Sequence, residues 1–523
     1  MTGKGRLILI VLLVVGSIAG MLAWKFYEPM KKAQDVEDTS MAKDMLGEID
    51  LRDDNFFGYF MIRSKQMRSM MIQNRWHLKI TDDKADYPAR MEALAKGEAD
   101  MAVVTVDSYL LNAAKYDYPG TLTFVIDKSA GVDALVGWKK AGTSLNDFRG
   151  KKIRVCFTPD SPSHHFLKAL KTGFDLPEVL PPKGSPLRIE TDGSEEAMKF
   201  LLADKCDLAM GWEPDISRTL AKESGIVRLI GTEKMDGYIV DVLAVSREFL
   251  KKHPEAVKLF MANYFRALNY YTKEHPEELR IELMAETGQS AEVVEKMLKG
   301  IVWVNLTQNC LVWFGIGPAS ANPSTLLAET IESTVAVLID NKDFDKNPLP
   351  DGDPFKIFYG DILAELFKKS AAGMASENAP AVVNSLETKF DAMSADRWAT
   401  LKEIGTLKVE PIVFQSGTAR LGLDGKTDLD LLAEKMKHFP TARLKVFGHT
   451  SIEGDPVANK ELSLERAEAC VKYFEVTYSM DPNRFLPIGM GGGKPLPQLP
   501  DEEDRGWLYR LPRVEMMLVV DEI

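Results

Sequence analysis

Strand-like and helix-like segments alternate from about residue 50 to residue 340, and this alternation limits the possible folds more than any other feature of the chain. Residues 122–126 and 153–157 have the composition of buried strands, and residues 163–172 have the apolar spacing of a helix. Alternating strands and helices are typical of α/β architecture. We therefore expect an α/β fold over this region.

A short motif occurs twice in this region, about 107 residues apart. In each copy a helix end and a tight turn lead to an acid, Asp100 or Asp207, and then to a buried strand. The repetition predicts two similar lobes, although it is too short to establish a duplication.

The composition narrows the function further. A chain of 523 residues is long enough for roughly two to four domains. Its net charge of −12 argues against a nucleic-acid partner, which requires a basic protein surface. Four cysteines exclude a disulfide scaffold or a cysteine-rich zinc module, and seven histidines without an H-E-x-x-H pattern indicate no metal site. We expect neither a metal nor a cofactor.

Residues 7–24 contain no charged side chain and have about the length that crosses the hydrocarbon of a membrane as a helix. We expect a single-pass inner-membrane anchor over residues 1–24 and a charged tether over residues 25–48, with the bulk of the chain in the periplasm. A cleaved signal peptide is the alternative, because residues 17–19 form a small-x-small cleavage site.

Two breaks divide the remainder of the chain. Residues 345–354 are rich in Asp, Pro and Gly, and residues 370–380 are mostly small. Such stretches are typical of linkers. They predict an α/β domain over residues 49–343, a linker with helices over residues 344–394 and a second α/β domain over residues 395–523.

Five short motifs occur in the first domain in the order and spacing of one family: Gly58-Tyr59-Phe60, Gly97-Glu98-Ala99-Asp100, Leu145-Asn146-Asp147-Phe148, Thr158-Pro159-Asp160-Ser161-Pro162 and Trp212-Glu213-Pro214. Together they resemble the solute-binding proteins of ABC importers of the nitrate, sulfonate and taurine type. The resemblance implies a periplasmic-binding-protein fold with two α/β lobes, a hinge and a small molecule closed between the lobes. An ABC permease or another envelope protein is the implied partner.

Ligands of α/β sheets lie beyond the carboxyl ends of the strands and at helix N-termini. Ser161 and Ser163 lie between a predicted strand and a predicted helix, where hydroxyls and peptide N–H groups can hold an oxyanion; a plain helix cap is the alternative. Comparable positions, with the tyrosine of the first motif, complete the candidate ligand-binding set: Tyr59, Asp107, Ser108, Ser129, Asp133, His164, Trp212 and Glu213. The acids in this set argue against a multivalent anion without protons or hydroxyls.

Catalysis has little support in the sequence. There is no pair of nucleophile and base in a recognisable motif, and the glycine-rich residues 489–494 lack the spacing of a phosphate loop, which predicts a flexible turn. We therefore expect a binding protein rather than an enzyme. Cys156 and Cys206 lie in or next to strands of one lobe, either as two buried thiols or as a disulfide.

The second domain carries its own motif, Gly448-His449-Thr450 followed by Asn459, Leu462-Ser463 and Arg466-Ala467. This motif resembles OmpA-type C-terminal domains, and the resemblance implies that the domain binds peptidoglycan. The positions implied to contact the wall are Thr450, Ser451, Asn459, Arg466 and Arg513. The helix that carries Arg466 is expected to begin with Ser463 as its N-cap.

One departure from the family predicts weak or atypical peptidoglycan binding. Family members place an Asp directly after Gly-His-Thr, whereas this chain has Ser451, which cannot pair with an ammonium group. Losing a charged partner in a pocket costs on the order of 1.5–3 kcal/mol. Arg466 still offers a planar fork to a carboxylate, and Glu453 or Asp455 could replace the missing acid.

These patterns predict a membrane-anchored periplasmic protein that binds a small molecule, for transport or sensing, and is linked to the cell wall by its OmpA-like domain. The alternative is a structural, stator-like envelope protein that tethers the inner membrane to peptidoglycan and has a vestigial ligand cleft.

Overall fold

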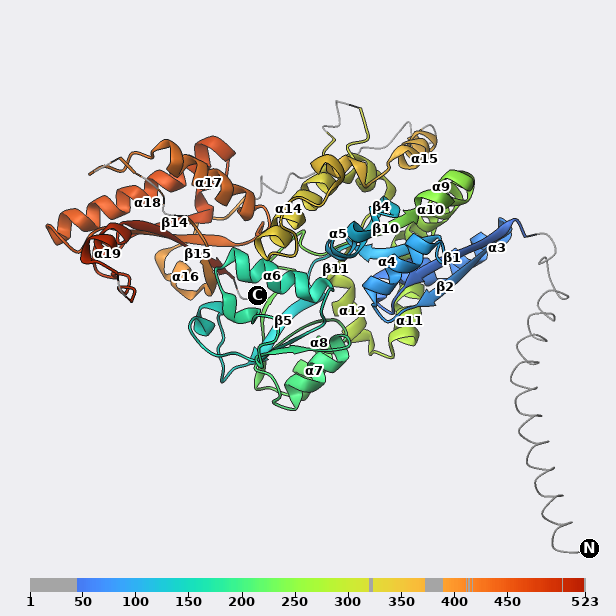
Figure 1. Cartoon of the computed structure of the whole chain (residues 1–523), viewed down its shortest axis with the longest axis horizontal. Coiled ribbons are helices and arrows are strands. Elements are labelled where there is room, and N and C mark those ends of the chain that lie inside the picture. The colour runs from blue at the N-terminus through green and yellow to red at the C-terminus, as the bar shows by residue number, and fades with distance from the viewer. Residues whose placement is uncertain are drawn as a thin grey trace, which may run out of the picture.

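The computed structural model describes residues 45–318, 323–371 and 389–521, except positions 411, 413, 416 and 501. Three β-sheets follow one another along the long axis of the molecule, and helices cover each of them (Figure 1). The expected membrane anchor lies outside the described residues, as do most of the tether and part of the linker. Within the described ranges, every helix is too short or too polar to cross a membrane.

The first lobe is built on a six-stranded sheet with the order β11-β4-β10-β3-β1-β2. β1 pairs in parallel with β2 and β3, whereas β10 runs antiparallel to β3 and β4. The strands are β1 (Gly47–Asp53), β2 (Trp76–Asp82), β3 (Met101–Thr105), β4 (Gly120–Ser129), β10 (Val240–Ser246) and β11 (Ile301–Trp303). The expected strand over residues 122–126 lies within β4.

Helices from both ends of the domain cover this sheet, and their apolar faces form one buried core with it. The N-terminal ones are α2 (Phe60–Arg63), α3 (Lys65–Gln73), α4 (Tyr87–Lys96) and α5 (Val106–Ala113). The later ones are α9 (Arg247–Lys252), α10 (Pro254–Asn269), α11 (Pro276–Thr287), α12 (Ala291–Lys299), α13 (Leu306–Gln308), α14 (Leu326–Asp340) and α15 (Asp361–Ala371).

The second lobe is built on a five-stranded sheet with the order β7-β6-β8-β5-β9. Its strands are β5 (Asp133–Trp138), β6 (Val155–Phe157), β7 (Arg188–Glu190), β8 (Leu208–Trp212) and β9 (Ile226–Gly231), and its helices are α6 (Pro162–Gly173), α7 (Ser194–Leu202) and α8 (Asp215–Lys222). β6 and α6 correspond to the expected strand over 153–157 and helix over 163–172. Cys156 and Cys206 are buried free thiols rather than a disulfide.

The repeated motif has the same structural role in both lobes. Asp100 Oδ2 accepts a hydrogen bond from the peptide N–H of Asp50 at 3.0 Å, and Asp207 Oδ2 accepts one from the peptide N–H of Arg154 at 2.8 Å. In each lobe the acid after the tight turn therefore binds the backbone of a neighbouring segment of the sheet. The expectation of two similar lobes agrees with this geometry.

Two segments of chain connect the lobes, one between β4 and β5 and the other between β9 and β10. Ser129 and Thr232 join these segments through their hydroxyl oxygens at 2.6 Å, and the peptide N–H of Gly131 donates to Thr232 Oγ1 at 2.8 Å. α14 packs against α5 of the first lobe and α6 of the second. These two crossings, called the hinge below, are where the resemblance places one.

The C-terminal domain has a four-stranded sheet with the order β12-β15-β13-β14. Its strands are β12 (Lys402–Leu407), β13 (Arg443–His449), β14 (Phe485–Gly489) and β15 (Arg513–Val520), and its helices are α16 (Ala395–Thr400), α17 (Leu423–Met436), α18 (Pro456–Tyr478) and α19 (Asp504–Arg510).

The expected start of the helix carrying Arg466 was wrong. α18 begins at Pro456, and Asp455 caps it by accepting from the peptide N–H groups of Val457 and Ala458. Ser463 is a buried residue inside the helix. Its hydroxyl instead accepts from the peptide N–H of Gly491 at 2.9 Å. A serine that binds a neighbouring loop resembles a cap in sequence, because both roles favour the same side chain.

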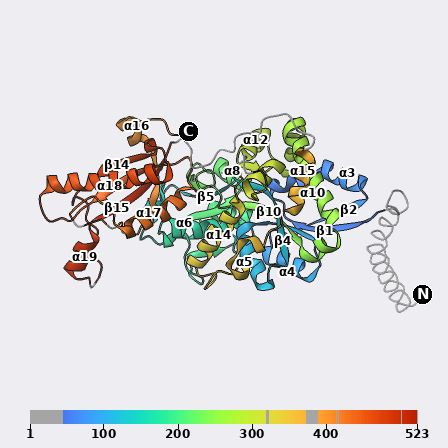
Figure 2. The same ribbon diagram turned by 90° about the horizontal axis from the view of Figure 1, so that it is seen from above.

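The C-terminal domain packs against the second lobe, and the two share one apolar cluster (Figure 2). The rings of Phe174 in the second lobe and Phe439 in the C-terminal domain lie edge to face, with centroids 5.9 Å apart. The peptide N–H of Lys408 donates to the carbonyl oxygen of Gly173 at 2.8 Å. Gly405 is required in this contact, because a Cβ there would lie 2.9 Å from the Phe174 ring.

Candidate functional site

A small pocket of about 20 Å³ lies between the two lobes, which is about the room of one water molecule. The first lobe contributes acids and aromatic rings to the pocket wall. The second lobe and the hinge contribute one acid, one aromatic ring and two apolar side chains. The lining residues are Asp54, Phe56, Tyr59, Tyr87, Thr105, Asp133, Pro162, Trp212, Ile239 and Asp241. The pocket is this small because the two lobes approach each other closely at it.

Tyr59 and Asp241 form the first-lobe wall. The Tyr59 hydroxyl donates to Asp241 Oδ1 at 2.5 Å, and both side chains are buried. Asp127 lies directly opposite Asp241 on the neighbouring strand, so the two carboxyl groups share one face of the sheet. Burial raises the pKa of Asp241, and the neighbouring Asp127 carboxylate raises it further.

Asp133 and Trp212 form the second-lobe wall and are paired across β5 and β8. The Ser129 hydroxyl donates to Asp133 Oδ2 at 2.6 Å, and burial raises the pKa of Asp133 to about 7. Ser129, expected to bind ligand, therefore connects the hinge to the pocket: its oxygen also lies 2.6 Å from Thr232 Oγ1. Tyr59, Asp133 and Trp212 are the expected ligand residues that the structure places on the pocket wall.

Asp107 and Ser108 lie at the start of α5, next to the lining residue Thr105. Ser108 and Thr105 form a capping box, with their hydroxyl oxygens 2.7 Å apart, so this serine is used by the helix itself. Asp107 is buried, and its Oδ1 receives no hydrogen bond. Burial raises the pKa of Asp107 to about 7.

The residues expected to bind a ligand at the start of α6 have different roles in the structure. Ser161 occupies the N-cap position, but its hydroxyl donates to the carbonyl oxygen of Thr158 at 2.7 Å and caps no peptide N–H. Ser163 is fully buried, and its hydroxyl has no hydrogen-bond partner. His164 Nδ1 accepts from the peptide N–H of Asp160 at 3.2 Å. Of the three expected residues, only Ser163 keeps an unused polar atom.

Glu213 follows Trp212, but its carboxylate is already hydrogen-bonded within the protein. Its two carboxylate oxygens accept from the peptide N–H and the hydroxyl of Ser217, each at 3.0 Å. This arrangement holds the start of α8 and leaves the side chain buried.

Sequence reasoning missed several lining residues, among them Asp54, Phe56, Tyr87 and Asp241. A signal for Asp54 existed, since it follows directly after the end of β1. In the sequence, the only sign that Asp241 and Asp127 have a special role is that each is an acid inside an apolar strand. Which face of the sheet they occupy depends on the pairing of β4 with β10, which the sequence does not state.

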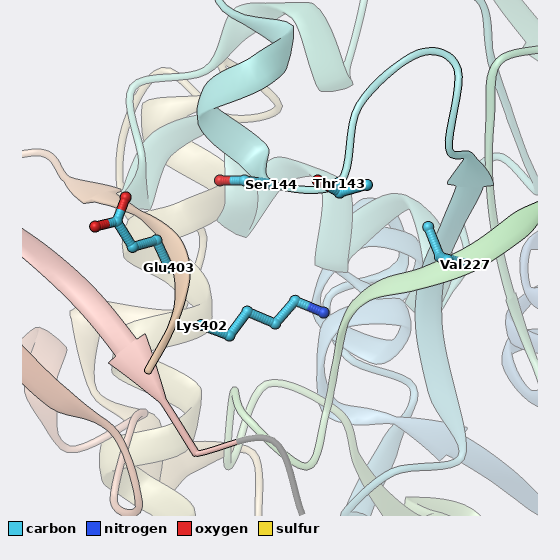
Figure 3. A pocket seen from close by; sticks show the side chains of 5 residues that line it. All are labelled: Thr143, Ser144, Val227, Lys402 and Glu403. Carbon is cyan, nitrogen blue, oxygen red and sulfur yellow. The ribbon is translucent and has the colours of Figure 1, made fainter. Parts of the chain in front are cut away.

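A larger cavity of about 420 Å³ lies where the C-terminal domain meets the second lobe (Figure 3). It is lined by Thr143, Ser144, Val227, Lys402 and Glu403, and the Lys402 side chain extends across it. Its lining is polar except for Val227, and the shared apolar cluster flanks it. We interpret it as the open rim of the domain interface rather than as a ligand site.

One face of α18 carries the expected wall-binding residues of the C-terminal domain. Asn459, Ser463 and Arg466 are spaced by four and three residues, which places them on the same side of a helix. Asn459 Nδ2 donates to the carbonyl oxygen of Glu453 at 2.8 Å, and Arg466 Nε donates to that of Thr418 at 3.1 Å. The guanidinium of Arg466 also lies over the Phe414 ring, 5.1 Å from its centroid.

The loop after β13 carries the other expected positions. Thr450 is buried, and its hydroxyl has no hydrogen-bond partner. Ser451 Oγ accepts from the peptide N–H of Glu453 at 3.1 Å. Asp455, which was expected as a possible replacement for the missing acid, instead caps α18.

The remaining expected position, Arg513, lies on β15 and is held within the domain. Its Nε donates to Glu515 Oε1 at 2.8 Å, and its Nη1 donates to the carbonyl oxygen of Leu511 at 3.0 Å. Arg466 and Thr450 are buried, and Thr450 is the one of these expected residues whose hydroxyl has no hydrogen-bond partner within the described part of the chain.

The glycine-rich turn after β14 is packed against this site rather than being loose. A Cβ on Gly489 would lie 2.6 Å from the carbonyl oxygen of Lys460 in α18, and one on Gly492 would lie 2.6 Å from that of Ser451. The glycines are required because the turn approaches α18 and the loop after β13 too closely for any side chain.

Comparison with solved structures finds proteins that resemble part of this chain. The aliphatic sulphonate-binding protein SsuA of Escherichia coli is 15% identical with a TM-score of 0.45, and the match covers 60% of this chain and 98% of that one. The nitrate-binding protein NrtA of Synechocystis is 11% identical with a TM-score of 0.43, covering 63% and 89%. A ligand-binding component of an ABC-type import system of Staphylococcus aureus is 14% identical with a TM-score of 0.45, covering 61% and 98%.

Comparison of sequences gives one match. None of the curated proteins matches the chain. A family model does match its C-terminal part, over the residues that form α17, α18 and the loops around Arg466. Residues 413–505 of this chain are an OmpA-family domain.

Proposed function

We propose that the chain is a periplasmic small-molecule-binding protein held at the cell wall by its OmpA-family domain, and that it serves transport or sensing. The observation that carries the proposal is the hinged pair of lobes, whose pocket is lined from both sides by buried polar side chains. Proteins of this architecture close two lobes around a ligand by a hinge motion.

The proposed wall contact is made by Arg466, whose guanidinium can form paired hydrogen bonds with a carboxylate of the wall peptide. Without an acid at position 451, the contact is weaker than the family's usual one. We also propose that residues 1–24 anchor the chain in the inner membrane, which places the two lobes between membrane and wall. The partner at the membrane would be an ABC permease that receives the ligand, or an envelope protein that senses closure.

Two binding measurements on the full chain test the proposal. In the first, thermal unfolding is followed in the presence of a panel of amino acids, amines, sulfonates and vitamins, since a ligand that binds only the folded state raises the Tm. In the second, the chain is co-sedimented with isolated peptidoglycan sacculi. We expect one solute class to raise the Tm and the sacculi to retain the chain.

The outcomes separate the proposal from its alternative. Retention by sacculi without a response to any solute would favour a structural tether with a vestigial cleft. Absence of both would contradict the proposed function.

A further inference from the structure

The pocket between the lobes has an unusual chemical composition for a site that would bind an oxyanion. Among the described residues that line it there are three carboxyl groups, four aromatic rings and no basic side chain. The carboxyl groups belong to Asp54, Asp133 and Asp241. An anion would meet like charge on both lobes, whereas a cation would be attracted from both.

The basic residues closest to the pocket are already engaged by protein groups. Arg90 donates to both oxygens of Asp83, to Asp54 and to the carbonyl oxygen of Val103. Because its donors are directed at these acceptors, Arg90 offers almost nothing to an anion.

Two further bases near the pocket are also paired with acids. Lys168 Nζ lies 2.8 Å from Asp343 Oδ2, and Arg228 Nη2 lies 2.6 Å from Glu233 Oε2. This leaves Asp133 and Asp241 as the pocket residues whose carboxyl groups can become charged without a basic side chain hydrogen-bonded to them.

Two buried carboxyl groups, one on the pocket wall and one behind it, have few hydrogen-bond donors. Asp133 is 4% exposed and lines the pocket, yet the hydrogen bond found in the described residues reaches only its Oδ2, from Ser129. Asp127 is fully buried, no N–H or O–H group of another described residue reaches its oxygens, and it can hydrogen-bond to the neighbouring Asp241 only when one of the two carboxyl groups carries a proton. A buried carboxylate without a donor is costly unless it gains a proton or a cation.

Each lobe presents an acid together with an aromatic ring. In the second lobe Asp133 and Trp212 are directly opposite residues on β5 and β8, so their side chains lie on one face of the sheet. In the first lobe Tyr59 donates to Asp241, and the Phe56 ring packs edge to face on the Tyr59 ring at 5.2 Å. Carboxylates combined with aromatic faces are the side chains that hold organic ammonium groups.

We propose that the ligand of this cleft is a small organic ammonium cation, held between Asp133 and Trp212 of the second lobe and Asp241 and Tyr59 of the first. This inference rests on the proposed function for the existence of a ligand and adds the ligand's charge and class. A bare metal ion fits less well, because no group of three metal-ligating side chains forms in the part of the chain that the structure describes. The pocket of about 20 Å³ has to widen to hold such a cation, and the cation's charge would then attract one acid from each lobe.

The test uses the full chain and four probes. Choline and putrescine carry the ammonium charge, 3,3-dimethylbutan-1-ol has the shape of choline without its charge, and methanesulfonate is an anion of similar size. Binding is measured by titration calorimetry and by the Tm. We expect choline or putrescine to bind and to raise the Tm, and we expect the neutral and anionic probes to have no effect.

Variants locate the charge that does the binding. Asp133→Asn and Asp241→Asn keep the shape of the side chain and remove its charge, so each should weaken cation binding by about tenfold or more. Asp100→Asn is the matched control. Asp100 is also an acid of the first lobe, but it accepts a hydrogen bond from the backbone of Asp50 and does not line the pocket. Its cation affinity should equal that of the unaltered chain. If an Asn variant fails to fold, the Glu variant at the same position is measured instead. It keeps the negative charge, so it should keep the binding of the cation.

The pH dependence gives a second readout, because the charge of choline does not change with pH. Asp133 faces Ser129 and lies near Arg228 and Glu213, whereas Asp241 faces Asp127 and Tyr59. In both cases burial dominates and favours the protonated form. The cation requires the ionised form, so its affinity should rise between about pH 5.5 and pH 8 with release of protons. An anion would show the opposite slope.

Three results would overturn the inference. Binding of methanesulfonate but of neither cation would leave the proposed function standing and refute the cation. Equal binding of choline and its neutral analogue would show that charge plays no part. No response to any probe or to the wider solute panel would contradict both the inference and the proposed function.

Discussion

His438 of the C-terminal domain and Asp236 of the hinge exchange two hydrogen bonds. The peptide N–H of Asp236 donates to the carbonyl oxygen of His438 at 2.7 Å, and the His438 ring nitrogen Nδ1 lies 2.8 Å from the carbonyl oxygen of Asp236. The Asp236 carboxylate in turn binds Lys128 of β4 at 2.7 Å. The OmpA-family domain therefore contacts one of the two segments that connect the lobes.

Removing the His438 ring should loosen this contact. His438→Ala loses the hydrogen bond to Asp236 and the packing on Tyr238, whose ring centroid lies 4.3 Å away. We expect the interface to lose about 1–3 kcal/mol, which is typical for a buried polar contact. Hydrogen exchange of β12 and of residues 144–149 should become faster, while the sheets of the lobes stay protected.

The control for this variant is His77→Ala, since His77 is exposed and pairs only with Glu48 on the surface. Unchanged exchange at β12 in His438→Ala would show that the apolar cluster alone holds the domains together.

The buried acid Asp107 should make the unliganded chain less stable as the pH rises. Burial raises its folded pKa to about 7, above its usual value, so the folded state binds more protons than the unfolded state between these two pKa values. Stability from this group is therefore present at low pH and is lost as the pH rises toward 7. The loss is at most about 4 kcal/mol, because each pKa unit corresponds to about 1.4 kcal/mol.

The measurement is urea unfolding of the natural chain and of Asp107→Asn at several pH values. Burial lowers the pKa of His164, His165 and His438, which gives a slope of opposite sign that both chains share. The difference between the two chains isolates Asp107. A difference that does not change with pH would mean that the carboxyl group is ionised throughout.

Ser163→Ala separates a ligand contact from a plain core position. Its hydroxyl is buried without a partner, so removing it should leave the unliganded fold equally stable or up to about 1 kcal/mol more stable. If Ser163 binds the ligand, the same variant should weaken binding by about fivefold. Calorimetry with the ligand and urea unfolding without it report the two effects separately.

Ser161→Ala is the matched comparison for this prediction. Its hydroxyl already donates to Thr158, so its loss should destabilise the chain rather than change affinity. Loss of affinity in Ser161→Ala alone would reverse the two assignments.

Arg466 and Ser451 should act in opposite directions on wall binding. Arg466→Lys keeps a positive charge but loses the planar fork and the packing on Phe414, so retention by sacculi should fall by about tenfold. Ser451→Asp should tighten binding, because the acid supplies a partner for an ammonium group. An Asp also accepts the same bond from the peptide N–H of Glu453 that Ser451 accepts now.

Arg510→Lys is the control, because Arg510 lies on α19 and pairs with Glu502. Equal retention of all variants would mean that the domain holds the wall by another face or binds a protein instead.

Local patterns in the sequence determined much of this protein. The alternation of segments predicted the α/β lobes, and the motif around Arg466 predicted the OmpA-family domain. The repeated acids Asp100 and Asp207 predicted two similar lobes because the turn-then-strand motif around each is local, although the backbone that each acid binds, at Asp50 and Arg154, lies far back in the chain. The proposed charge of the ligand was not among these predictions.

The tertiary structure decided which residues meet. Asp127 and Asp241 are far apart in the chain and become neighbours only through the register of β4 and β10, and Asp133 joins the pocket only because the second lobe packs against the first. The bond between Asp236 and His438 depends in the same way on how the C-terminal domain packs on the second lobe. A sequence states which side chains are available, but contacts between distant segments depend on strand pairing and on the packing of whole faces. For that reason the α/β lobes and the OmpA-family domain were visible in the sequence, whereas the acidic pocket and the contact with the hinge were not.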